Sequence, residues 1–164
     1  MIALGFGSGL AKWAPGTLGS VVGLGLYLSL SLLPVAAYLG LVALAGLLGI
    51  WICARAAKVM QQKDPSAIVW DEIVGIWCAL IWVPIEPFWL LLAFGLFRYL
   101  DIAKPGPIGW LDRRLTGGVG IMADDVVAGI LTCLMVHGAM LGVSIWPFEA
   151  DARAYCQTIR TMTR

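Results

Sequence analysis

The sequence predicts an all-α, multihelical membrane protein with about five apolar helices, and two observations carry this prediction. Hydrophobic residues make up 60% of the 164 residues and charged residues only 13%, against roughly 45–50% and about 25% in a typical soluble domain. So few charged side chains could not cover the surface of a soluble protein of this size. The apolar residues also fall into long runs, which form helices in lipid because each backbone polar group must be satisfied within its own segment.

Five apolar runs along the chain are the expected helices, and Pro or acidic residues border most of them. They cover residues 18–33, 35–54, 68–83, 88–100 and 126–146. The second run is long enough to cross a hydrocarbon core of about 30 Å at about 1.5 Å per residue, whereas the third and fourth are short for a span. We expect residues 1–146 to form one helical domain and residues 147–164 a C-terminal tail.

The segments that connect these runs place most of the positive charge on one side. If the helices alternate in direction, residues 5–16, 55–70 and 101–123 emerge on the same face. This face collects eight of the eleven Lys and Arg residues: Lys12, Arg55, Lys58, Lys63, Arg98, Lys104, Arg113 and Arg114. Because basic loops of membrane proteins stay in the cytoplasm, we expect a multi-pass protein with this face on the cytoplasmic side.

Six of the ten acidic residues fall on the same face. They are Asp71, Glu72, Asp101, Asp112, Asp124 and Asp125. Carboxylates brought together in this way repel one another unless a cation neutralises them. A set of oxygen ligands without His or Cys favours a hard ion such as Mg²⁺. The sequence therefore predicts a Mg²⁺ site, and with it an active site, at the cytoplasmic ends of the helices.

Positive side chains lie beside these acids in the sequence. Arg98 precedes Asp101 by three residues, so the two share one face of a helix, and Lys104 and Arg113 follow shortly after. Cations beside a carboxylate–metal cluster are suited to binding phosphate oxygens. We therefore expect Arg98, Lys104 and Arg113 to bind an anionic substrate.

A Pro-Gly turn precedes the first apolar run, within residues 14–20 (APGTLGS). This pattern predicts a helix that begins with Thr17 as its N-cap. Free backbone amides at a helix start bind anions, so Gly16 and Thr17 are further candidates for substrate binding.

Other common kinds of site are disfavoured. The net charge of +1 excludes a strongly basic nucleic-acid-binding protein. The four Cys residues are widely spaced without a CxxC pair, so they indicate neither a zinc site nor a disulfide framework. The single histidine, His137, lies deep in the fifth run, and we expect it to be packed or bonded to its own helix.

Three blocks of the sequence resemble the phosphatidylglycerophosphatase A family. The first is GFGSG at 5–9 with APGTLGS at 14–20, and the second is VWDE at 69–72. The third extends from FRYLD at 97–101 through KP at 104–105 and WLDR at 110–113 to GGVGIMADD at 117–125. Together and in this order the blocks are highly specific, and the resemblance covers most of the chain.

The resemblance implies a Mg²⁺-dependent phosphatase of the bacterial inner membrane, with membrane lipid around it. It would hydrolyse the phosphomonoester of phosphatidylglycerophosphate to phosphatidylglycerol and phosphate in phospholipid synthesis. On this basis we expect Asp71, Glu72, Asp101, Asp124 and Asp125 to be catalytic. The metal ligands would come from these five and Asp112, and the substrate ligands would be Arg98, Lys104, Arg113, Gly16 and Thr17.

Two rival classes remain as alternatives. A CDP-alcohol phosphotransferase needs an Asp-Gly dipeptide in its signature, and the chain has none. A membrane transporter or channel with an interfacial acidic cation site is the other alternative. It predicts charges spread through the spans, whereas the acids of this chain gather at one interface.

Overall fold

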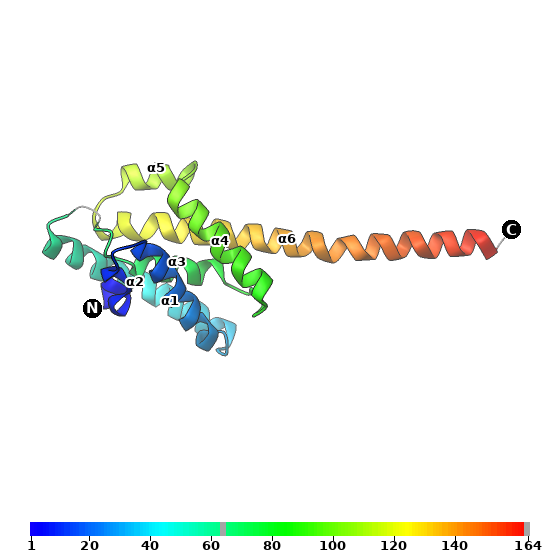
Figure 1. Cartoon of the computed structure of the whole chain (residues 1–164), viewed down its shortest axis with the longest axis horizontal. Helices are drawn as coiled ribbons and strands as arrows, with labels where there is room; N and C mark the ends of the chain where they lie inside the picture. Colours follow the sequence, from blue (N-terminus) through cyan, green and yellow to red (C-terminus); the bar gives the residue numbers. More distant parts are fainter. Residues whose placement is uncertain (63–64, 163–164) are drawn as a thin grey trace.

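The computed structural model describes the backbone of residues 1–62 and 65–162 and the side chains of residues 1–62 and 65–143. Over these residues it contains seven helices and no strand, which confirms the all-α class. Figure 1 shows the helices, which in chain order are the 3-10 helix η1 (Ile2–Leu10), α1 (Pro15–Leu30), α2 (Val35–Met60), α3 (Trp70–Ala79), α4 (Pro87–Ala103), α5 (Pro107–Arg114) and α6 (Gly117–Met162).

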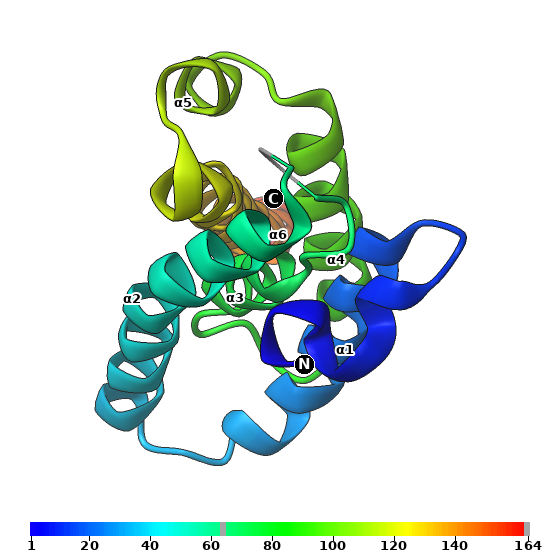
Figure 2. The same cartoon turned by 90° about the vertical axis from the view of Figure 1, so that its left-hand side faces the viewer.

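The centre of the fold is α3, a helix of only 10 residues. Every residue from Ile73 to Ala79 is buried, and Asp71 is buried as well. Helices α1, α2, α4 and α6 all contact α3, and Figure 2 shows them gathered around it. At about 1.5 Å per residue α3 is about 15 Å long, half of a hydrocarbon core. The third run therefore forms a helix that is too short to span a membrane, and its apolar side chains form the protein core.

Two described helices, not about five, are long and apolar enough to cross a membrane. They are α2 and the part of α6 from Gly117 to Val143. In each, only 22% of the most apolar 18-residue stretch is buried, unlike the enclosed core helix of a soluble protein. Helices α1 and α4 have 16 and 17 residues and are shorter than a typical span.

Helix α6 begins earlier than the sequence predicts. The fifth apolar run starts after Asp125, but the helix starts at Gly117, so Asp124 and Asp125 lie in its third turn rather than before its first. The glycine-rich segment is helical because it packs directly on α2: a Cβ on Gly118 would collide with the backbone carbonyl of Ile50. Because of this early start, the carboxylates of Asp124 and Asp125 project from the side of α6 rather than from its N-terminal end.

Glycines also allow α6 to cross α3 at close range. A Cβ on Gly129 would collide with the backbone carbonyl oxygen of Gly75 and would lie 2.8 Å from the Cβ of Cys78. Small residues at helix crossings permit this kind of backbone contact. The crossing holds the carboxylates of α3 and α6 at a short separation.

We expect the Gly129→Ala variant to lose about 1–3 kcal/mol of stability, because the added methyl group overpacks the α3–α6 crossing. Thermal unfolding in detergent micelles measures this loss. The matched control is Gly138→Ala on the exposed side of the same helix, where nothing lies within 4 Å of the added Cβ. Equal unfolding temperatures for the two variants would contradict the close crossing.

The segments that carry the charged motifs meet at one end of the helix bundle. Figure 1 shows the end of α2, helix α5 and the start of α6 together at the left, whereas the turns between α1 and α2 and between α3 and α4 lie on the opposite side. The grouping of residues 101–123 with the end of the second run is therefore confirmed. Lys63, which the sequence also places on this face, lies outside the described residues.

Candidate active site

Three carboxylates converge between α3 and α6. Asp71 and Glu72 lie in the first turn of α3, and Asp125 lies on α6. One oxygen of each residue lies within 4.8 Å of those of the other two. Asp71 and Asp125 are 7% and 3% exposed. We call these three residues the acidic triad.

The acidic triad contains two oxygen atoms that lack a partner. Asp71 Oδ1 and Glu72 Oε2 are buried, and neither makes a hydrogen bond to any part of the chain that the structure describes. An unpartnered buried polar atom in a native protein requires an explanation, such as a bound ion. The lone pairs of both oxygens are thus free to coordinate a cation.

Burial and mutual repulsion make the negative charge of the triad unfavourable by itself. Burial raises the pKa of Asp71 well above its ordinary value, and the charges of Glu72 and Asp125 raise it further. Burial also raises the pKa of Glu72, although a hydrogen bond with Asp71 acts in the opposite direction. The triad is therefore arranged to hold a positive species, either protons or a metal ion.

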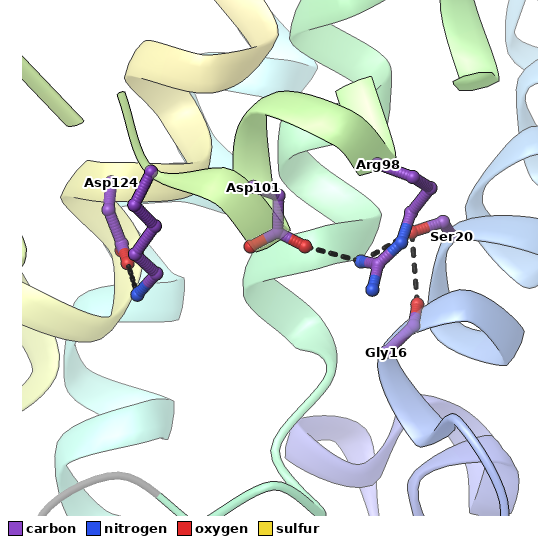
Figure 3. A network of polar contacts seen from close by, with 6 residues as sticks. Gly16, Ser20, Arg98, Asp101 and Asp124 are labelled. Atoms are coloured by element: carbon purple, nitrogen blue, oxygen red, sulfur yellow. Dashed lines mark hydrogen bonds and ion pairs between the residues drawn. The ribbon is translucent and has the colours of Figure 1, made fainter. Parts of the chain in front are cut away.

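Arg98 and Asp101 form a second group in the last turns of α4. Arg98 Nη1 lies 2.5 Å from Asp101 Oδ2, and both side chains are 14% exposed. The same Nη1 donates to Ser20 Oγ on α1 at 3.4 Å, and Figure 3 shows the guanidinium between these two partners. This pair confirms that Arg98 and Asp101 share one face of a helix. The Asp101 charge acts on Glu72, so the pair lies close to the acidic triad.

Lys104 binds two of the three predicted acids that the triad does not contain. Its Nζ lies 2.6 Å from Asp112 Oδ1 and 2.6 Å from Asp124 Oδ2. Burial acts to lower the pKa of Lys104, but hydrogen bonds and charge from Asp112 and Asp124 outweigh it and raise the pKa. In Figure 3, Asp101 lies between Asp124 and Arg98. The two cations of the site thus have separate partners, Asp101 for Arg98, and Asp112 and Asp124 for Lys104.

Gly16 lies against both the triad and Arg98. A Cβ at this position would collide with Glu72 Oε1 and would lie 3.2 Å from Arg98 Nη2. The absence of a side chain thus lets the first turn of α1 approach the carboxylate and the guanidinium together. The structure places Gly16 at the site, as the sequence predicts.

Two other predicted substrate ligands, Thr17 and Arg113, make no polar contact with the acidic triad in the described part of the chain. Helix α1 begins at Pro15, with Ala14 at the N-cap position, so the expectation that Thr17 caps the helix is wrong. The helix starts three residues earlier, at Pro15, because Pro fits the first helical position. Thr17 is half-buried and Arg113 is exposed. Neither has a hydrogen bond or ion pair to the acidic triad within the described part of the chain.

Ser20 is a residue of this site that the sequence analysis missed. Its side chain is fully buried, and its hydroxyl donates to the Gly16 carbonyl at 3.0 Å. The spacing of four residues from Gly16 places both on one face of α1, and this spacing is the signal in the sequence. Only the packing of α1 beside α4 brings that face to Arg98.

The prediction for His137 agrees with the structure. His137 Nδ1 lies 2.8 Å from the backbone carbonyl of Cys133, one turn earlier in α6, so it is bonded to its own helix. Cys53 and Cys78 are buried in the hydrophobic core. Cys156 lies outside the side chains that the structure describes.

The site can hold a hard divalent cation and an anion side by side. The triad supplies only oxygen donors, two of them buried and unpartnered, which is the ligand chemistry that Mg²⁺ prefers. The positive charge of Arg98 acts on Glu72, and Lys104 pairs with Asp124, the neighbour of Asp125 in α6. The fold and the site thus define a helical protein that is suited to phosphate chemistry.

Comparison with known proteins identifies the family. The family model of Phosphatidylglycerophosphatase A matches residues 1–140. A protein of that name from Escherichia coli (strain K12) is 41% identical over 138 residues, which cover 84% of this chain and 80% of the relative. Another from Haemophilus influenzae is 47% identical over 139 residues, which cover 83% of this chain and 85% of the relative. The chain belongs to the phosphatidylglycerophosphatase A family and is a phosphatase.

The name of a further relative mentions a different substrate. A Bacteroides thetaiotaomicron protein, provisionally named phosphatidylinositol-3-phosphatase, is 39% identical over 144 residues, which cover 83% of this chain and 89% of the relative. No solved structure matches the chain.

Proposed function

We propose that the chain hydrolyses the phosphomonoester of phosphatidylglycerophosphate to phosphatidylglycerol and inorganic phosphate, with Mg²⁺ held by the acidic triad. The observation that carries this proposal is the pair of unpartnered buried oxygens, on Asp71 and Glu72, beside the guanidinium of Arg98. The names of two relatives support the substrate. Phosphatidylglycerol is a membrane phospholipid, so the reaction belongs to phospholipid synthesis.

The spacing of the triad oxygens is compatible with a small divalent ion. Opposite ligands of Mg²⁺ are about 4.2 Å apart, because each Mg–O distance is about 2.1 Å. The triad oxygens, which lie within 4.8 Å of one another, need only small side-chain movements to reach this separation. When bound, the ion supplies Lewis-acid polarisation of the phosphoryl oxygens. Asp101 is the nearest candidate for a further ligand.

The fixed cations of the site bind the phosphate and stabilise its transition state. Arg98 Nε is buried and has no hydrogen-bond partner in the described chain, so it can donate to a phosphate oxygen. Lys104, which Asp112 and Asp124 hold in place, adds a second positive charge. Charge spreads over the equatorial oxygens during phosphoryl transfer, and donors held in place stabilise that charge.

We assign the proton transfer to Asp101, a carboxylate outside the triad whose charge acts on Glu72 and which pairs with Arg98. The oxygen of a water molecule attacks phosphorus, and Asp101 accepts the proton that this water loses. The bond between phosphorus and the glycerol oxygen breaks, and the leaving oxygen takes a proton from solvent. The chain has no DxD motif of the aspartate-based phosphatases, which favours direct attack by water over a covalent aspartyl-phosphate.

We propose that α2 and the 117–143 part of α6 cross the bacterial inner membrane, with the site at the cytoplasmic surface. The outward faces of both helices carry large apolar side chains: Leu47, Trp51 and Leu134 are 68%, 63% and 64% exposed. Such surfaces are stable in contact with lipid. The basic residues at the site end support the cytoplasmic orientation through the positive-inside rule.

Phosphate release from a panel of substrates tests this function. The purified protein in detergent is given phosphatidylglycerophosphate, phosphatidic acid, phosphatidylinositol 3-phosphate or glycerol 3-phosphate, with Mg²⁺ or with EDTA. We expect phosphatidylglycerophosphate to react fastest, EDTA to abolish the reaction and added Mg²⁺ to restore it. Faster hydrolysis of phosphatidylinositol 3-phosphate would overturn the substrate, and full activity in EDTA would overturn the metal. Absence of phosphate release from phosphatidylglycerophosphate with Mg²⁺ present would overturn the proposed reaction.

The raised pKa of Asp71 predicts how pH affects the metal-free protein. The unfolded chain loses the Asp71 proton near pH 4, while the folded protein retains it to a higher pH. The folded state therefore binds more protons in this window, so its stability falls as pH rises. We expect the unfolding temperature in EDTA to be lower at neutral pH than near pH 4, and Mg²⁺ to raise it more at neutral pH. A Mg²⁺ effect that is equal at both pH values would contradict binding at the triad.

A further inference from the structure

The side chain of Arg98 is held from two directions through a single nitrogen atom. Nη1 donates to Asp101 Oδ2 and to Ser20 Oγ, which uses both of its N–H groups. A guanidinium has five N–H groups, so those of Nε and Nη2 remain. Nε is buried without a partner in the described chain. Nε–H and one N–H of Nη2 point in the same direction and form the fork that binds two oxygens of a phosphate.

The two anchors of Arg98 act from different helices. Asp101 lies three residues further along α4, so it can restrain Arg98 only relative to its own helix. Ser20 lies on α1 and is fully buried. Its hydroxyl donates to the Gly16 carbonyl, which leaves the oxygen lone pairs free to accept from Arg98. The hydroxyl thus links Arg98 to the turn of α1 that lies against Glu72.

We infer that Ser20 is a positioning residue, whose hydroxyl fixes the Arg98 guanidinium so that its Nε–Nη2 fork faces two oxygens of the substrate phosphate. This inference rests on the proposed function, in which Arg98 binds the phosphate. A buried hydroxyl that bonds to the carbonyl four residues earlier is common in helices. The bond from Arg98 distinguishes Ser20 from such a purely local role.

Four proteins test this inference: wild type, Ser20→Ala, Arg98→Ala and the double variant. We expect Ser20→Ala to lower kcat/KM for phosphatidylglycerophosphate roughly tenfold and to weaken competitive inhibition by inorganic phosphate by a similar factor. If Ser20 acts only through Arg98, its substitution has no further effect in the Arg98→Ala background. Additive losses in the double variant would overturn the inference.

A matched control separates positioning from simple loss of a buried hydroxyl. Thr132 on α6 is also fully buried, and its hydroxyl donates to the carbonyl of Ala128, four residues earlier, at 2.8 Å. We expect Thr132→Val to leave phosphate inhibition unchanged, with unfolding temperatures measured for every variant. A loss of phosphate inhibition in Thr132→Val equal to that in Ser20→Ala would overturn the inference.

The same set of proteins distinguishes failure of the Ser20 inference from failure of the proposed role of Arg98 in the reaction. If Arg98→Ala is inactive and Ser20→Ala is as active as wild type, only the role of Ser20 fails. If Arg98→Ala itself retains full activity, the proposed role of Arg98 in the reaction fails first.

Discussion

Replacement of Asp71 by Asn is expected to abolish Mg²⁺-dependent phosphate release without loss of folded protein. The side chain keeps its shape but loses the charge that would hold the ion, and loss of metal polarisation is worth several kcal/mol, or roughly 10³-fold in kcat. The metal-free variant is also expected to unfold at a temperature equal to or above that of the wild type at neutral pH. The reason is that substitution removes a buried charge repelled by Glu72 and Asp125. Activity thus falls while the stability of the metal-free protein does not.

The matched control for this prediction is Asp112→Asn. Asp112 is also an acid of the site, but its side chain is 41% exposed and pairs with Lys104 rather than with the triad. We expect Asp112→Asn to retain Mg²⁺ affinity within about threefold, as measured by the Mg²⁺ concentration that gives half-maximal activity. If both variants lose metal affinity equally, the division of the acids into a triad and a Lys104 group is incorrect.

Replacement of Arg98 by Ala is expected to lower kcat/KM roughly 10²–10³-fold, the usual effect of removing a fixed donor to the transition state. The loss should be larger in kcat than in KM, because charge on the phosphoryl oxygens develops mainly in the transition state. Steady-state kinetics with phosphatidylglycerophosphate at saturating Mg²⁺ measures it. The variant also leaves Asp101 without its ion-pair partner, so the unfolding temperature is measured alongside.

Arg114→Ala is the control for loss of a positive charge near the site. The guanidinium of Arg114 lies over the ring of Trp110, 5.1 Å from its centroid. The residue is exposed at the end of α5. We expect less than a threefold change in kcat/KM. Equal losses in Arg98→Ala and Arg114→Ala would argue against a specific role for Arg98 and for a general electrostatic effect.

Local features of the site could be predicted because short-range geometry controls them. Arg98 and Asp101 are three residues apart in a helix, and this spacing places them on one face. Asp71 and Glu72 begin an apolar run, and the structure has them in the first turn of α3. The grouping of acidic and basic segments at one end followed from alternating helix directions. In each case the periodicity of the helix is sufficient to locate the side chain.

Features that depend on contact between helices could not be predicted. The third run looks like a membrane helix because hydropathy does not distinguish burial in protein from burial in lipid. The choice of Asp71, Glu72 and Asp125 as one group, with Asp124 directed to Lys104, depends on the rotation of α6 against α3. Neighbouring residues in a helix point about 100° apart, so Asp124 and Asp125 serve different partners.

The amino-acid sequence alone determined the helical class, the apolar exterior, the supply of oxygen ligands and cations, and the family resemblance. These properties follow from composition, helical periodicity and short motifs, which are local. Tertiary structure decided that α3 is the core, that three of the six acids share one site and that Ser20 reaches Arg98. Each of these features depends on the distance and the rotation at which two helices pack. Side-chain volumes and glycine contacts distributed over the whole chain determine that packing.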